Sequence, residues 1–395
     1  MNCPICNNKN YQSLLELPNA PIYQHPVTQD CNIPRPYFLD LEYYYCPECG
    51  HAFQKHFDCS LMDRIYANHY YTPAPDGVGH QFRDEFFSAI NLIVTALKQN
   101  CRILEIGSSS GEVLASFKEK TEHAYLMGYE PSKKSAETAE KRGIPTRCEF
   151  FSPETIVSEI NPYDLIMSRH VIEHIVDFDS FWKAIAMVSH ASTTLILETP
   201  SLEIALEQPS IAPFHIEHAH VFSANSLASL AAIYGWYAEQ CHFTTSGNMI
   251  ISFIRQKEPA VTTEPPVCTT QLQQLINVQI KKITDEISKR KVILWGAGAG
   301  GLKLLCTYQL SPDKLVDGNK NKKGQIFCGQ PWVIEYAPDV IRNLVELGSD
   351  MQDDYIIVIG STFYKEIKEQ LKELNWKGKV IAPYEWNNNL LSGDK

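Results

Sequence analysis

The sequence has no apolar stretch long enough to cross a bilayer, and its first residues lack the pattern of a signal peptide. Met1 to Pro4 offer neither a basic start nor an apolar core. An excess of basic residues is also missing: the net charge is -11, which argues against general nucleic-acid binding. We therefore expect a cytoplasmic protein that binds neither membranes nor nucleic acid.

Disulfide bonds are not expected in that compartment, so the 12 cysteines of the chain need another explanation. Four of them form two CxxC pairs, one near residue 3 and one near residue 46. Two such pairs supply the four thiolates of a closed tetrahedral zinc site. A pair of redox CxxC motifs is the alternative, but neither opens an evident βαβ unit. The sequence predicts a structural zinc ion bound by Cys3, Cys6, Cys46 and Cys49.

The dinucleotide-binding pattern GxGxxG is absent from the first glycine-rich loop of the chain. A short apolar strand begins at Cys101, the loop extends from Gly107 to Gly111, and a helical pattern follows. This order predicts the first crossover of a doubly wound α/β sheet. A second strand leads to Glu130, where a carboxylate suits two ribose hydroxyls.

The spacing of Glu105, Gly107, Gly111 and Glu130 resembles the S-adenosylmethionine site of class I methyltransferases. The run over 163–174 resembles the fourth strand and following helix of the same superfamily. An ordinary βαβ unit without a ligand is the alternative. The resemblance implies a cofactor site made of Glu105, Gly107, Ser108, Ser109, Gly111, Glu130, Pro131, Phe151, Arg169 and His170.

Three histidines and one glutamate fall within six positions of a later segment: His215, Glu217, His218 and His220. Imidazole and carboxylate at short spacing suit zinc or iron. They also suit acid–base chemistry, because histidine titrates near neutral pH and a carboxylate can orient it. An exposed polar loop is the third interpretation. We favour the acid–base interpretation.

A narrower resemblance combines the CxxC pairs, the first glycine loop, and Glu217-His218 followed by Phe222-Ser223. These features look like the sugar C-methyltransferases, bacterial enzymes that methylate a carbon of a nucleotide-linked keto-deoxysugar. That family has Tyr-His-Glu-His followed by Tyr-Phe-Ser, whereas here His215 and Ile216 replace the first two residues and Val221 the second Tyr. Ser109 and Ser110 replace its frequent Asn-Asp. The resemblance therefore specifies the zinc and cofactor sites more closely than it specifies the substrate or carbon as the methyl acceptor.

The resemblance implies an α/β protein with a zinc-binding domain over 1–60 and a methyltransferase domain over 61–255. A linker over 256–270, rich in proline and threonine, leads to a second Rossmann-like domain over 271–395. The glycines of Trp295–Gly301, with Asp317, would by themselves suggest NAD binding. In the family this domain helps to hold the sugar nucleotide, and a helix N-terminus over Gly298–Lys303 suits a phosphate.

The mechanism that follows is S-adenosylmethionine-dependent methylation of a carbon through an enolate. His218 is the expected base and Glu217 its orienting carboxylate. His174, with Tyr70 or Tyr71, is expected to donate hydrogen bonds to the keto oxygen, and His215 takes the part of the missing Tyr or marks a different acceptor. The alternatives are an O- or N-methyltransferase, a non-catalytic binding protein and a dehydrogenase. The expected partner is a nucleotide sugar, and the expected assembly a monomer or small homo-oligomer.

Overall fold

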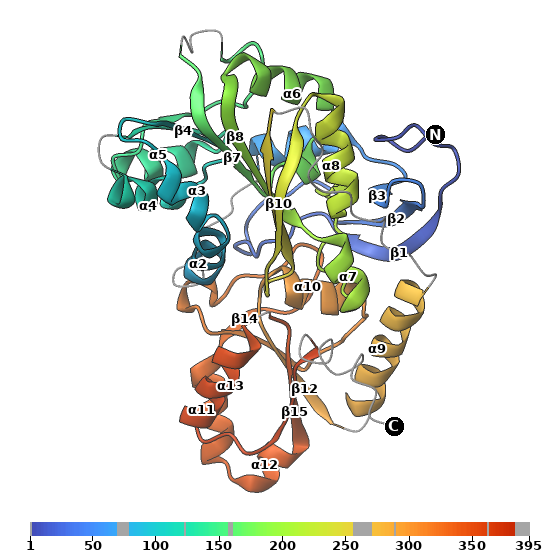
Figure 1. Ribbon diagram of the computed structural model, residues 1–395. Helices are drawn as coiled ribbons and strands as arrows, with labels where there is room; N and C mark the ends of the chain where they lie inside the picture. Colours follow the sequence, from blue (N-terminus) through green and yellow to red (C-terminus); the bar gives the residue numbers. More distant parts are fainter. Residues whose placement is uncertain are drawn as a thin grey trace. The chain divides into compact units, whose positions relative to one another are not determined.

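The computed structural model describes residues 2–68, 79–121, 124–156, 161–255, 271–287, 290–361 and 363–383 (Figure 1). The chain divides into two compact units whose segments alternate along the sequence. Unit 1 comprises 1–12, 44–204 and 217–268, and unit 2 comprises 13–43, 205–216 and 269–395. The three consecutive domains expected from the sequence stay a prediction, and the expected linker over 256–270 lies outside the described residues.

Unit 1 is built on a seven-stranded mixed sheet with the order β10-β11-β8-β7-β4-β5-β6. The central strands are parallel, while β11 pairs antiparallel with both β8 and β10. This arrangement confirms the predicted α/β fold. The strands are β4 (Arg102–Ile106), β5 (Tyr125–Tyr129), β6 (Thr146–Arg147), β7 (Tyr163–Arg169), β8 (Ser189–Pro200), β10 (Tyr237–Phe243) and β11 (Asn248–Ile254).

Helices cover both faces of this sheet. Ile103 and Leu104, consecutive residues of β4, are both fully buried, and they belong to two separate apolar clusters. Because strand side chains alternate between faces, the central strands must be covered on both sides. Figure 1 shows α4 on one side and α6 and α8 on the other. The helices are α1 (Cys59–Asn68), α2 (Gly79–Ala89), α3 (Asn91–Ala96), α4 (Glu112–Lys120), α5 (Lys133–Lys141), η1 (Ile172–His174), α6 (Phe178–Met187), α7 (Leu202–Glu207) and α8 (Ala224–Ile233).

The order of connections reverses between β4 and β7. From β4 the chain proceeds to β5 and β6 on one side, and then returns to β7 on the other side of β4. At such a switch point the loops after adjacent strands separate and leave a crevice at the carboxyl ends. The loop after β4 and the turn after β7 therefore face a common space.

A second sheet has the strand order β1-β2-β3-β9, with β1 at Gln12–Pro21, β2 at Phe38–Cys46, β3 at His51–Gln54 and β9 at His220–Val221. Strands β3 and β9 pair antiparallel, with Ala52 opposite Val221 and Phe53 opposite His220. This pairing joins the strand that follows the second CxxC pair to the histidine-rich segment.

Unit 2 contains a five-stranded parallel sheet with the order β14-β13-β12-β15-β16. Its strands are β12 (Lys291–Trp295), β13 (Lys314–Asp317), β14 (Ile334–Tyr336), β15 (Tyr355–Ile359) and β16 (Lys379–Ile381). Its helices are α9 (Gln271–Ile287), α10 (Ala299–Cys306), η2 (Lys320–Lys322), α11 (Ala337–Glu346), α12 (Ser349–Asp354) and α13 (Tyr364–Glu373). Within the described parts of the chain, no helix has the length and apolar character needed to span a membrane.

Candidate active site

A cavity of about 840 Å³ opens in unit 1 at the switch point of the large sheet. Nine of the ten residues expected to bind the cofactor line it: Glu105, Gly107, Ser108, Ser109, Glu130, Pro131, Phe151, Arg169 and His170. The tenth, Gly111, is the N-cap of α4, directly after the lining loop. Residues far apart in sequence thus meet around one space, but their role in cofactor binding stays a prediction.

The loop after β4 has a backbone shape that requires glycine at its start. Gly107 has φ +73°, in the left-handed region that residues with a side chain rarely adopt. A Cβ added there would lie 2.4 Å from Val171 Cγ2, in the turn after β7. The backbone N–H groups of Gly107 and Ser108 both donate to the Tyr129 carbonyl, at 2.8 and 3.1 Å. The loop is therefore held against the end of β5.

We expect Gly107→Ala to weaken the binding of S-adenosylhomocysteine at least tenfold, because the added methyl group forces Val171 or the loop to move. The measurement is isothermal titration calorimetry. Gly143→Ala is a matched control: Gly143 also has φ +73°, but an added Cβ would meet only the flexible end of Lys118, at 3.3 Å. The control carries the backbone strain, about 1–2 kcal/mol, without the clash. Equal affinity in both variants would contradict a cofactor site at this loop.

Glu105 is a buried carboxyl group at the cavity wall. It is 3% exposed, and within the described structure its Oε2 has no hydrogen-bond partner. Burial raises the pKa of Glu105 to about 8, against the opposing effect of Arg169. An unsatisfied buried oxygen beside a cavity favours a cationic group of a ligand. The ammonium group of S-adenosylmethionine fits this position.

Glu130 follows β5 and has both carboxylate oxygens directed at backbone groups. Oε2 accepts from Ser109 N at 2.9 Å and Oε1 accepts from Ser132 N at 2.7 Å. Burial raises the pKa of Glu130, and these two hydrogen bonds oppose that effect. Each oxygen has a second lone pair, so the carboxylate is oriented and still suited to two ribose hydroxyls.

Binding of S-adenosylhomocysteine at pH 7 is expected to release about one proton, because a pKa near 8 keeps Glu105 protonated before the ligand's ammonium pairs with it. Calorimetry in buffers of different ionisation enthalpy measures this proton, and Glu105→Gln should abolish its release. The folded pKa also exceeds the usual 4.5. The wild-type ligand-free protein should therefore lose stability between pH 4.5 and about 8 relative to Glu105→Gln. Proton release that persists in the variant would contradict this role.

Glu173, His174 and His218 form a cluster beside the cavity, in which Glu173 and His218 are buried and His174 is half-buried. The short helix η1 carries Glu173 and His174, and His174 lines the cavity. Glu173 Oε2 accepts from the Thr199 hydroxyl at 3.0 Å. Its Oε1 lies 3.4 Å from His170 Nδ1 and 4.0 Å from His218 Nε2. The rings of His174 and His218 meet edge to face with centroids 4.8 Å apart.

Glu173 was missed by the sequence analysis. It is fully buried, and burial tends to raise its pKa, but His170 and His174 outweigh that effect and the pKa is lowered. Glu173 is therefore ionised beside His218. A signal was present, because Glu173 lies next to His174 directly after a predicted strand.

The second CxxC segment and the His218 segment are joined by hydrogen bonds. Gln54 Nε2 donates to the His218 carbonyl at 2.8 Å, and Gln54 N donates to the Ala219 carbonyl at 2.9 Å. The same two strands, β3 and β9, bring His51 Nε2 to 3.0 Å from His220 Nδ1. Burial lowers the pKa of His220 to about 3, so this imidazole stays neutral. His220 is thus part of the packed core and its ring pairs with His51.

The remaining predicted catalytic residues fall in different places. His215 belongs to unit 2, where its Nδ1 lies 3.0 Å from Gln24 Nε2 and its carbonyl accepts from the Tyr43 hydroxyl at 2.8 Å. Glu217 belongs to unit 1, and its carbonyl lies 2.8 Å from His174 Nδ1. Tyr70 and Tyr71 lie outside the described residues. The catalytic roles of all four stay predictions.

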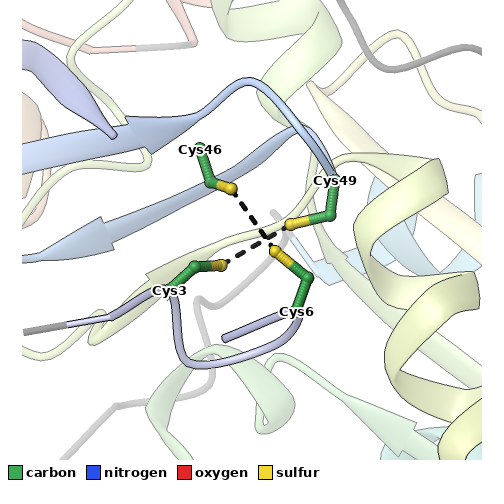
Figure 2. A group of neighbouring side chains, drawn as sticks. All are labelled: Cys3, Cys6, Cys46 and Cys49. Carbon is green, nitrogen blue, oxygen red and sulfur yellow. Dashed lines mark hydrogen bonds between the residues drawn. The ribbon is translucent and has the colours of Figure 1, made fainter. Parts of the chain in front are cut away.

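The four cysteines of the two CxxC pairs meet in one cluster (Figure 2). Cys3 Sγ lies 3.6 Å from Cys49 Sγ, and Cys6 Sγ lies 3.5 Å from Cys46 Sγ. All four sulfurs lie within 4.8 Å of one another. Four thiolates at about 2.3 Å from a tetrahedral zinc ion are about 3.8 Å apart. The residues therefore fit the predicted ion.

In the glycine turn of unit 2, the backbone of Gly301 packs directly against the backbone of Gly296. A Cβ on Gly301 would lie 1.8 Å from the Gly296 carbonyl oxygen. Asp317 Oδ2 accepts from Ala297 N at 2.7 Å and from Lys322 Nζ at 3.1 Å. Lys303 Nζ donates to the carbonyls of Ile211 and Ala212. Asp317, which suggested NAD binding together with the glycines, and Lys303 both hold loops of unit 2 together.

Comparison with known proteins places a methyltransferase domain over this site. A family model described as a methyltransferase domain matches residues 78–240. Among proteins with curated functions, none matches significantly. The matched range contains the first glycine loop, Glu130, the β7 turn and His218. The chain therefore contains a methyltransferase domain, and this domain includes the site.

Solved structures also resemble parts of the chain. A SAM-dependent methyltransferase of Thermotoga maritima is 18% identical, over 46% of this chain and 95% of that one, with a TM-score of 0.35. The magnesium protoporphyrin IX methyltransferase of Synechocystis, solved with bound SAH, is 13% identical, over 51% of this chain and 96% of that one, with a TM-score of 0.36.

Proposed function

We propose that the protein methylates a carbon beside the ketone of a nucleotide-linked deoxysugar. The observation that carries the proposal is the cluster of Glu173, His174 and His218 at the cavity at the switch point. Carbon methylation needs a base and a group that stabilises an enolate, and this group offers both. The sugar is inferred from the resemblance of the sequence to the sugar C-methyltransferases.

The cavity residues are suited to hold the cofactor in one orientation. S-adenosylmethionine, when bound, supplies an electrophilic methyl group. Glu105 would pair with its ammonium group and Glu130 with its ribose hydroxyls. Phe150 lines the cavity and is 62% exposed, so its ring is available for stacking on the adenine. Phe151 packs edge to face against Tyr129, which fixes this wall.

His218 is the proposed base. It would take the proton from the carbon beside the ketone and leave the electron pair on the enolate. Glu173, ionised and 4.0 Å from His218 Nε2, stabilises the positive charge that the imidazole gains. His174 donates its Nδ1 hydrogen to the Glu217 carbonyl, which orients the ring, and Nε2 is the ring nitrogen that would stabilise the enolate oxygen. Glu217 thus positions His174 through its backbone.

The other parts of the proposal follow the domain pattern of the resembled family. The four-cysteine cluster binds a structural zinc ion, and unit 2 contributes to holding the sugar nucleotide. A sugar oxygen or nitrogen is the second candidate acceptor, because His215 and Ile216 replace residues of the family's active-site run. A base next to a carboxylate also suits those acceptors, but they require no enolate.

The test uses the full-length protein, a panel of nucleotide-linked 4-keto-6-deoxysugars and deuterated water, with NMR as the readout. We expect the hydrogen beside the ketone to exchange with deuterium. When S-adenosylmethionine is added, we also expect a new carbon-bound methyl group. A methyl group on oxygen or nitrogen without exchange would identify the second candidate. Tight binding of S-adenosylhomocysteine with no reaction on any sugar would overturn the sugar proposal.

A further inference from the structure

Glu173, His174 and His218 place one carboxylate oxygen and two imidazole nitrogens within 4.8 Å of one another. Two imidazoles and one carboxylate are a donor set that zinc and iron(II) prefer, and three protein ligands leave a coordination position open. We propose that these three residues form a second metal site, distinct from the cysteine cluster, for a divalent ion of the zinc or iron(II) type.

The spacing within the group suits ligands of one ion better than direct partners. His218 Nε2 lies 4.0 Å from Glu173 Oε1, which is too long for a hydrogen bond. Two ligands that each lie about 2.0–2.1 Å from a metal ion are roughly 3–4 Å apart. A small contraction would therefore bring both atoms to one ion.

The proposed ligands Glu173 and His174 each make a hydrogen bond to a further group, as metal ligands in proteins commonly do. Thr199 donates its hydroxyl hydrogen to Glu173 Oε2, whereas the buried Oε1 makes no hydrogen bond of normal geometry in the described structure and lies 3.4 Å from His170 Nδ1. His174 Nδ1 donates to the Glu217 carbonyl, which leaves the lone pair of the neutral ring on Nε2. A ligating histidine commonly donates its other ring N–H to a carbonyl or carboxylate, and that bond sets its tautomer.

A bound ion would take the lone pair with which His218 is proposed to accept a proton. Metal binding and hydrogen exchange on the sugar should therefore exclude each other. This consequence depends on the proposed function, whereas the metal site itself does not, because it requires only the three ligands. The two ideas are thus open to separate tests.

The experiment titrates Co²⁺ into the full-length protein after the cysteine cluster has been loaded with Zn²⁺. Nitrogen and oxygen ligands give Co²⁺ a visible d–d band without the near-ultraviolet charge-transfer band of thiolates. We expect one such Co²⁺ per chain in the wild type and its loss in Glu173→Gln. Thr199→Val should weaken the affinity about 10- to 100-fold, as loss of an outer hydrogen bond does. His190→Asn is the control, since His190 pairs with Asp164 elsewhere.

No visible band in the wild type would overturn the metal site, as would equal Co²⁺ affinity in Glu173→Gln and His190→Asn. Glu173→Gln is uninformative if it fails to bind S-adenosylhomocysteine or shows an unfolded circular dichroism spectrum. In that case the Co²⁺ affinity of Thr199→Val tests the metal site, and an affinity equal to that of the wild type would overturn it. A protein that exchanges the sugar hydrogen but binds no second Co²⁺ refutes the metal site alone. One that binds Co²⁺ and, when Co²⁺ is absent, exchanges no sugar hydrogen refutes the proposed function alone.

Discussion

His218→Ala is expected to slow hydrogen exchange beside the ketone by about 10²- to 10⁴-fold, the usual contribution of a positioned general base. The affinity for S-adenosylhomocysteine should stay the same, because His218 is not among the residues that line the cavity. The measurement is the NMR exchange assay at saturating sugar, with and without S-adenosylmethionine. Methyl transfer should fall with exchange, since the enolate is formed first.

His190→Ala is the matched control for this variant. His190 also lies beside a carboxylate, with its Nε2 3.2 Å from Asp164 Oδ1, but on the partly exposed edge of unit 1. Its removal should leave exchange unchanged. Wild-type exchange in His218→Ala would rule out His218 as the base and would turn attention to His174, which lines the cavity.

Cys46→Ser should destabilise the protein more than any other single change considered for this chain. Cys46 is fully buried at the end of β2, and its sulfur is one of the four in the cluster. Structural zinc contributes about 10–16 kcal/mol to the folding of small zinc domains, which is comparable to the total stability of a typical protein. We expect loss of bound zinc, a large drop in the melting temperature, and loss of exchange, because β3 holds the His218 segment through Gln54.

Thermal unfolding and the zinc content of the purified protein measure this effect. Cys31→Ser removes an exposed cysteine that is outside the cluster, and it should change neither quantity. If Cys46→Ser retains the wild-type melting temperature, or if the wild type contains no zinc, the cluster is not a structural zinc site.

The meeting of the predicted cofactor residues around one cavity was largely predictable because these residues are close in sequence. Glu105, Gly107 and Gly111 lie on one strand, one loop and the start of one helix, so a local pattern specifies their relative positions. Glu130 follows the next strand, and parallel strands end at the same edge of a sheet. The four cysteines were predictable for a similar reason, since CxxC spacing directs two thiolates to one point.

The cluster of Glu173, His174 and His218 was predicted only in part. The sequence analysis selected His218 and His174 but assigned the orienting carboxylate to Glu217, the neighbour in sequence. The structure places Glu173 within 4.0 Å of His218 Nε2 and uses the Glu217 carbonyl to hold His174. Three histidines that fall within six positions of the sequence are also separated: His220 pairs with His51, 169 positions away, and His215 belongs to unit 2.

The amino-acid sequence was thus sufficient for the α/β class, the glycine loop and the composition of the cysteine cluster, because periodicity and short spacing act within single elements. Pairing between β3 and β9, and the position of η1 after β7, depend on contacts between segments far apart in the chain. Such contacts form only when the core is packed, so the partner of His218 and the neutral state of His220 could be read only from the folded molecule.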